Sequence, residues 1–143
     1  MLRLGPGATI ATMERELISG HSPYEPVFGF SRAVRAGARV VVSGTAPVPA
    51  DGSAPPAGPY DQARVCLGLI DEALTKAGAR LQDVVRTRMY LTDAAHWQEV
   101  ARAHGEVFGA IRPAATAVIV AGLLDPGWLV EIEAEAVLPV TAS

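Results

Sequence analysis

Three stretches near the C-terminus decide the fold of this chain: RTRMYLTD (86–93), HGEVFGAIRPAATAVIV (104–120) and LVEIEAEAV (129–137). Two of them carry polar residues at a spacing of two: Glu131, Glu133 and Glu135 in one, and Arg86, Arg88 and Tyr90 in the other. In a β-strand this spacing places side chains on one face. Two neighbouring strands are therefore expected to pair an acidic stripe with a basic one, either as a salt-bridged interface or as the floor of a polar site.

Hydrophobic periodicity predicts an alternation of strands and helices along the chain. Strands are expected over residues 8–16, 30–35, 39–46, 81–92, 116–123 and 128–138, and helices over residues 59–78 and 94–111. Glycine and proline predict loops over residues 18–27 and 46–59. Pro59 and Gly78 suit the two ends of the first helix, and Asp93 is placed to cap the second. This order predicts an α+β fold with both helices on one face of a single sheet.

The apolar stripes predict which side chains face the core. In the helices these are Ala63, Cys66, Leu67, Ile70, Leu74 and Ala77, followed by Trp97, Val100, His104, Val107 and Phe108. In the strand over 81–92 they are Val85, Thr87, Met89 and Leu91. The helices are expected to cover the face of Val85, Met89 and Ile132, so the opposite, charged face needs another cover.

Length and composition narrow the class of protein. A chain of 143 residues fits one domain, here spanning residues 1–143, with an N-terminal extension over 1–27 that holds the edge strand and a loop. Half of the residues are hydrophobic and 19% are charged, against about 25% in average chains. The surplus of apolar surface predicts subunit interfaces. The alternative is a chain that is merely rich in alanine and valine.

Charge and motif content exclude several functions. The net charge of −3 leaves no basic stripe for nucleic acid, and no run of 18 apolar residues would span a membrane. The N-terminal segment lacks the apolar core of a secretory signal, and the single cysteine, Cys66, forms no internal disulfide. A cytoplasmic location is expected. No metal-ligand spacing and no phosphate-binding loop occurs, so no cofactor is expected.

The same stretches carry a family resemblance. VSG (42–44), a strand ending in Asp93, Pro113-Ala114-x-Thr116 and VEIEA (130–134), in this order over residues 28–139, resemble the RidA (YjgF) family of reactive-intermediate deaminases. The resemblance implies a chorismate-mutase-like fold with a mixed six-stranded sheet, assembled as a homotrimeric barrel. It also implies hydrolysis of imines and enamines such as 2-aminoacrylate, with release of ammonia, and a small-molecule substrate at the subunit interface.

The resemblance further implies a set of site residues. Glu131 corresponds to the family's site glutamate, and a partly buried carboxylate suits proton transfer. The alternative makes Glu131 a salt-bridge partner of Arg86 or Arg88. Phe30 stands where the family has a site tyrosine, and the backbone NH groups near Gly44 and Thr45 would meet a substrate carboxylate.

One departure from the family pattern affects specificity. Active members place an arginine after Pro-Ala to hold the substrate carboxylate, whereas here Ala115 occupies that position, followed by Thr116. Losing hydrogen bonds to a charged group costs roughly 1.5–3 kcal/mol, or about 10- to 100-fold in affinity. Arg88, on the face of Glu131, is the candidate substitute, unless it only neutralises the acidic stripe. His104 replaces a helix tyrosine and is either a site residue or a core histidine.

Three functions remain open. The leading interpretation is a hydrolase of reactive imines or enamines whose specificity is shifted by Ala115, and the retained Glu131 favours it. The absent arginine favours a non-catalytic trimer that binds small metabolites. An endoribonuclease is the weaker alternative, because RNA cleavage needs cationic stabilisation of phosphate, and this chain is acidic.

Overall fold

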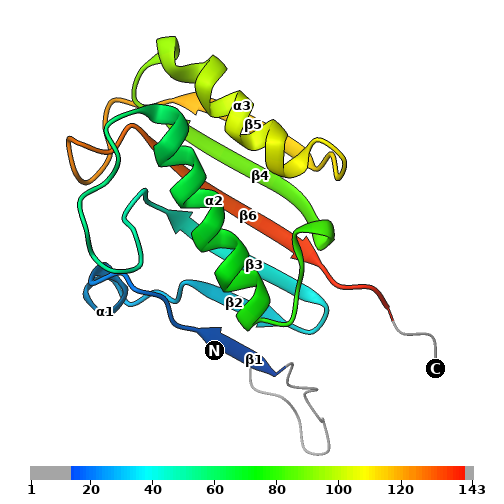
Figure 1. Cartoon of the computed structure of the whole chain (residues 1–143). Helices are drawn as coiled ribbons and strands as arrows, with labels where there is room; N and C mark the ends of the chain where they lie inside the picture. The colour runs from blue at the N-terminus through cyan, green and yellow to red at the C-terminus, as the bar shows by residue number, and fades with distance from the viewer. Residues whose placement is uncertain (1–13, 141–143) are drawn as a thin grey trace, which may run out of the picture.

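The structure, a computed structural model, describes residues 14–140 and contains one six-stranded sheet with two long helices on one face (Figure 1). The strands are β1 (Arg15–Ile18), β2 (Ala33–Ala36), β3 (Arg39–Thr45), β4 (Val84–Leu91), β5 (Ala114–Ile119) and β6 (Val130–Val137). The helices are α1 (Tyr24–Phe28), α2 (Pro59–Lys76) and α3 (Trp97–Phe108), with the 3-10 turns η1 (Leu81–Asp83) and η2 (Ala94–His96). The predicted α+β fold with a mixed sheet is confirmed.

The strand order is β1-β2-β3-β6-β4-β5, so the last strand of the chain lies at the centre of the sheet. All neighbouring strands are antiparallel except β4 and β5, which run parallel. A parallel pair needs a long crossover, and α3 supplies it. Figure 1 shows α2 and α3 side by side over the sheet, with β1 and β5 at its opposite edges.

The core lies between α2, α3 and the sheet. The stripe of α2 predicted from the sequence is buried, as are Met89 and Ile132 on the facing strands. Within α3 the residues below 3% exposure are Val100, Ala103 and Phe108. Asp93 Oδ1 accepts a hydrogen bond from the Ala95 backbone NH at 2.8 Å and so caps η2, which leads directly into α3. The predicted capping role of Asp93 is confirmed.

The pairing of acidic and basic stripes is also confirmed. In the register of β4 with β6, Tyr90 faces Glu131, Arg88 faces Glu133 and Arg86 faces Glu135. Arg88 Nη1 donates to Glu133 Oε1 at 3.2 Å, and Tyr90 Oη donates to the same oxygen at 2.6 Å. The alternate residues of β6, Val130, Ile132, Ala134 and Ala136, are the buried ones, so this charged face is turned away from α2 and α3.

Two predictions of burial are wrong. Val85 is 46% exposed, because the register of β4 against β6 shifts between Val84 and Arg86 and turns Val84 toward the core instead. An extra residue in one strand of a pair produces this change of face. Trp97 is 58% exposed, although a spacing of three places it on the same helix face as Val100. Periodicity gives the face of a helix but not the point along its axis where the core begins.

The N-terminal third differs most from prediction. The loop expected over 18–27 contains the short helix α1, which follows a capping pair: Ser22 Oγ accepts from the Tyr24 NH, and Glu25 Oε2 accepts from the Ser22 NH. Ser-x-x-Glu is a known helix-start signature. Pro26 is tolerated because it lies in the first turn, where NH groups have no helical partner.

The remaining differences concern the limits of elements. The edge strand expected over 8–16 lies mostly outside the described residues, which show β1 at Arg15–Ile18. The strand expected from residue 81 begins at Val84, after the turn η1, in which the Asp83 carboxylate accepts from the Arg80 NH at 2.9 Å. Of the helices in residues 14–140, none combines the length and apolar character needed to cross a bilayer.

Candidate functional site

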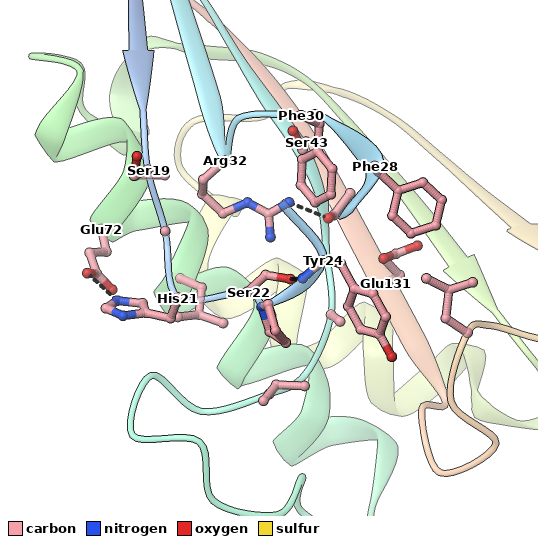
Figure 2. Close-up of a pocket in the computed structure, with 18 of the residues that line it drawn as sticks. Ser19, His21, Ser22, Tyr24, Phe28, Phe30, Arg32, Ser43, Glu72 and Glu131 are labelled. Carbon is pink, nitrogen blue, oxygen red and sulfur yellow. Dashed lines mark hydrogen bonds and ion pairs between the residues drawn. The ribbon is translucent and has the colours of Figure 1, made fainter. Parts of the chain in front are cut away.

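A pocket of about 650 Å³ lies where the segment after β1, the end of β3, one side of α2 and the start of β6 meet. Three residues predicted from the sequence line it: Phe30, Gly44 and Glu131. Aromatic side chains supply much of the remaining wall, and Trp128 is the most buried of them. Figure 2 shows Phe28, Phe30 and Tyr24 gathered on the side of the pocket that also holds Glu131.

Glu131 combines partial burial with close contact to backbone. A Cβ atom added at Gly44 would lie 3.2 Å from Glu131 Cδ, so the carboxyl group rests directly against that glycine. Burial raises the pKa of Glu131, the nearby Arg32 guanidinium opposes this, and Glu133 adds to it. A carboxyl group with a raised pKa, facing a cavity, suits the transfer of protons to and from a bound molecule.

Arg32 is a pocket residue that the sequence analysis did not single out. It is 8% exposed, and its Nη2 donates to the Gly44 carbonyl at 2.7 Å. Its Cζ atom lies 5.4 Å from the centre of the Phe30 ring. A signal was available: a spacing of two puts Arg32 and Phe30 on the same face of the strand expected over 30–35.

The other predicted site residues lie outside the pocket. Thr45 is fully buried and donates its hydroxyl to the Ser43 carbonyl at 2.8 Å. Arg88 is engaged with Glu133 on the charged face. His104 lies on the helix side of the sheet, where its Nε2 is 2.8 Å from Thr87 Oγ1 and burial lowers its pKa.

The remaining two, Ala115 and Thr116, lie exposed on β5 at the edge of the sheet. One chain thus brings Phe30, Gly44 and Glu131 together, and leaves these β5 residues apart from them. Within residues 14–140, no three His, Cys, Asp or Glu side chains gather in a way that would hold a metal ion.

Comparison with known proteins identifies the family. The model of the family described as Endoribonuclease L-PSP matches residues 20–138. The chain belongs to this family, also called YjgF. The resemblance to the RidA (YjgF) family read from the sequence is thereby confirmed.

Individual relatives of this YjgF-family chain extend over most of its length. The uncharacterized protein SCO2049 of Streptomyces coelicolor is 41% identical over 122 residues, which are 85% of this chain and 90% of that protein. The crystal structure of Rv2704 from Mycobacterium tuberculosis, a member of the YjgF/YER057c/UK114 family, is 46% identical with a TM-score of 0.79, covering 87% of this chain and 100% of its own. Escherichia coli TdcF, crystallised with bound serine, is 25% identical with a TM-score of 0.74, covering 86% of this chain and 94% of its own.

Cys66, the single cysteine of this YjgF-family chain, is expected to be inert in the native protein. It is fully buried under the sheet, its Sγ is 3.9 Å from the Val130 carbonyl, and burial raises the pKa of the thiol far above its usual range. Because the thiolate is the reactive form, Ellman's reagent should titrate no thiol at pH 7.5 and one thiol in guanidinium chloride. Rapid labelling of the native protein would contradict this burial.

Proposed function

We propose that this YjgF-family protein hydrolyses reactive imines or enamines and releases ammonia, with Glu131 as the catalytic residue. The observation that carries the proposal is the half-buried Glu131 carboxyl group, which faces a pocket of about 650 Å³ and rests against the Gly44 backbone. The hydrolase activity is the family property that this arrangement supports best. Ala115, in place of the family arginine, shifts its specificity.

Hydrolysis of a C=N bond needs two proton transfers that one carboxylate can perform. A water molecule adds its oxygen to the imine carbon, Glu131 takes the proton that the water loses, and the nitrogen receives that proton. In the resulting carbinolamine, Glu131 takes the hydroxyl proton and passes it to the same nitrogen. The C–N bond then breaks, ammonia leaves and a carbonyl compound remains. Imine and water are thus converted to carbonyl compound and ammonia with no redox partner.

The proposed assembly is a homotrimer with the substrate at the subunit interface. The supporting observation is the open face of the sheet, where all six residues of β5 are exposed, including Val118 and Ile119. Exposed apolar side chains on an uncovered sheet indicate an interaction surface. Analytical ultracentrifugation should give three times the chain mass of 14.9 kDa, and a monomer at micromolar concentration would contradict the assembly.

A non-catalytic metabolite-binding trimer is the second candidate. It is favoured by Ala115 and by TdcF, whose structure contains bound serine. The family's printed description also suggests RNA cleavage. A net charge of −3 gives that activity little support, because binding of nucleic acid relies on phosphate contacts from clustered cations.

The deciding experiment is an imine-hydrolysis assay. Imines are generated in the cuvette by an amino-acid oxidase or, for imines without a carboxylate, by an amine oxidase, and their decay is followed with and without the protein. Acceleration that disappears in Glu131→Gln supports the hydrolase. If no imine of either class decays faster than in buffer, while ligands still bind, the metabolite-binding trimer replaces it.

Gly44→Ala tests whether Glu131 must rest against the backbone. The added methyl would meet Glu131 Cδ at 3.2 Å and push the carboxyl group aside, although the backbone of Gly44 itself accepts an alanine. We expect kcat/KM to fall by about tenfold or more, because small displacements of a catalytic group are costly. Gly68→Ala is the matched control, since a Cβ there meets nothing within 4 Å and alanine favours helix α2. Equal activity of the two variants would contradict the proposed contact.

A further inference from the structure

Arg32 is a buried cation that forms no ion pair within residues 14–140. Arg32 is 8% exposed, and within residues 14–140 the one hydrogen bond of its side chain, from Nη2, goes to the Gly44 carbonyl. Nε is buried with no partner among residues 14–140.

A guanidinium in this position is costly unless an anion compensates it. Two carboxylates, those of Glu25 and Glu131, raise the pKa of Arg32 and so partly offset its burial. Both oxygens of Glu25 accept hydrogen bonds from backbone NH groups, Oε1 from Gly20 at 3.0 Å and Oε2 from Ser22 at 3.1 Å, and neither forms an ion pair with Arg32. Glu131 is held against Gly44 on the side of that residue which a Cβ would occupy. The guanidinium therefore remains available to an anionic group of a bound molecule.

Arg32 and Glu131 both contact Gly44, one at its carbonyl oxygen and the other at the position of its absent side chain. Because both also line the same pocket, one small bound molecule can contact both. In a 2-imino acid the C=N carbon is bonded directly to the carboxylate carbon. A carboxylate bound to Arg32 thus brings the reacting carbon next to the carboxylate end of Glu131.

The rest of the pocket is larger and more apolar than a three-carbon substrate requires. Tyr24 contacts Trp128 edge to face and also contacts Phe28, each at 6.2 Å between ring centres. Phe28 and Phe30 are 6.3 Å apart. A volume of about 650 Å³ is in the range of pockets that enclose drug-sized ligands. Figure 2 shows Tyr24, Phe28, Phe30 and Arg32 around one cavity, and Trp128 also lines it.

We infer that Arg32 binds the substrate carboxylate, and that the aromatic wall selects 2-imino acids whose side chain is an aromatic-sized apolar group. Arg32 thereby does the work of the arginine absent at Ala115. The assignment of 2-imino acids as substrates rests on the proposed hydrolase function. Binding of a carboxylate by Arg32 does not depend on that function and is tested separately.

The test is calorimetric titration with three stable probes: 3-phenylpropanoate, 3-phenylpropanamide and acetate. The wild-type protein should bind the phenyl acid about 10- to 100-fold more tightly than its amide, because a charge-assisted contact to Arg32 is lost in the amide. Arg32→Gln should abolish that preference and Arg32→Lys should retain part of it. Arg88→Gln should leave it intact, which separates Arg32 from the other candidate arginine.

Several outcomes would overturn the inference: equal affinity of wild type for acid and amide, or a preference that survives in Arg32→Gln and is lost in Arg88→Gln. If Arg32→Gln does not fold, the wild-type comparison still decides the carboxylate. Phe28→Ala, at a largely exposed position, then tests the aromatic wall. It should weaken the binding of 3-phenylpropanoate about tenfold relative to the binding of acetate. Binding as described, without imine hydrolysis, would refute the proposed function while leaving the role of Arg32 intact.

Discussion

Glu131→Gln is expected to lower kcat/KM for imine hydrolysis by about 100- to 10,000-fold, the usual contribution of a positioned acid–base group. Glutamine fills the same space against Gly44 but cannot take up the proton of the attacking water. Glu133→Gln is the matched control. Glu133 lies on the same strand face but outside the pocket, where it accepts hydrogen bonds from Arg88 and Tyr90. Similar losses in both variants would show that the charged stripe, and not Glu131, supports the activity.

The pH dependence of the reaction follows from the same carboxyl group. Burial raises the pKa of Glu131, and the group must be ionised to accept the first proton. We therefore expect kcat/KM to rise with pH through a midpoint above about 4.3, the ordinary value for glutamate. This rising limb should be absent from the residual activity of Glu131→Gln. A midpoint at or below the ordinary value would contradict a buried catalytic carboxylate.

The raised pKa of Glu131 also predicts how the stability of the folded protein changes with pH. A carboxyl group whose pKa is higher in the folded protein than in the unfolded chain favours folding in its protonated form, so its ionisation destabilises the fold. This loss develops as the pH rises through the unfolded pKa and is complete above the folded pKa. Glu131→Gln should thus melt at a higher temperature than wild type at pH 7, and the difference should shrink toward pH 4. A constant difference across this range would point to a cause other than ionisation.

The sheet and its charged face were predictable because their signal is local. The alternation of Glu131, Glu133 and Glu135 with apolar residues fixes both faces of one strand without reference to the rest of the chain. The matching spacing of Arg86 and Arg88 on a second strand then favours the pairing that the register confirms. The long helix α2 was equally predictable, since its stripe and both its ends are marked in sequence.

The site was only partly predictable because its geometry depends on contacts between distant segments. Whether Arg32 has a carboxylate partner is decided by where Glu25 and Glu131 lie, and no spacing in the sequence contains that information. The bulge that exposes Val85 arises from the register of β4 against β6. The helix α1, by contrast, has a start signal in the sequence, Ser22 and Glu25, but the neighbouring prolines favour a loop.

Gln62→Ala is expected to have the largest effect on stability among polar substitutions that leave the pocket lining unchanged. Gln62 is 1% exposed on α2 and ties two irregular segments to that helix. Its Nε2 donates to the Pro56 carbonyl at 2.8 Å and the Gly127 carbonyl at 2.9 Å, and its Oε1 accepts from the Leu129 NH at 2.7 Å. Alanine would leave three backbone groups without these partners. An unsatisfied group costs about 1–3 kcal/mol when it is fully buried, and less where water can reach it, as at the exposed Gly127.

We expect Gln62→Ala to lose about 3 kcal/mol of unfolding free energy, which for a chain of this size lowers Tm by about 6–12 °C. Gln98→Ala is the matched control, because Gln98 is exposed on α3 and its side chain bonds to no other described residue; its effect should stay within about 0.5 kcal/mol. Gln62 holds the backbone on both sides of Trp128, so its loss should also weaken 3-phenylpropanoate binding in protein that remains folded. Equal stability of the two variants would mean that the segments around the pocket hold their positions without Gln62, and that packing of Trp128 against Tyr24 fixes the wall instead.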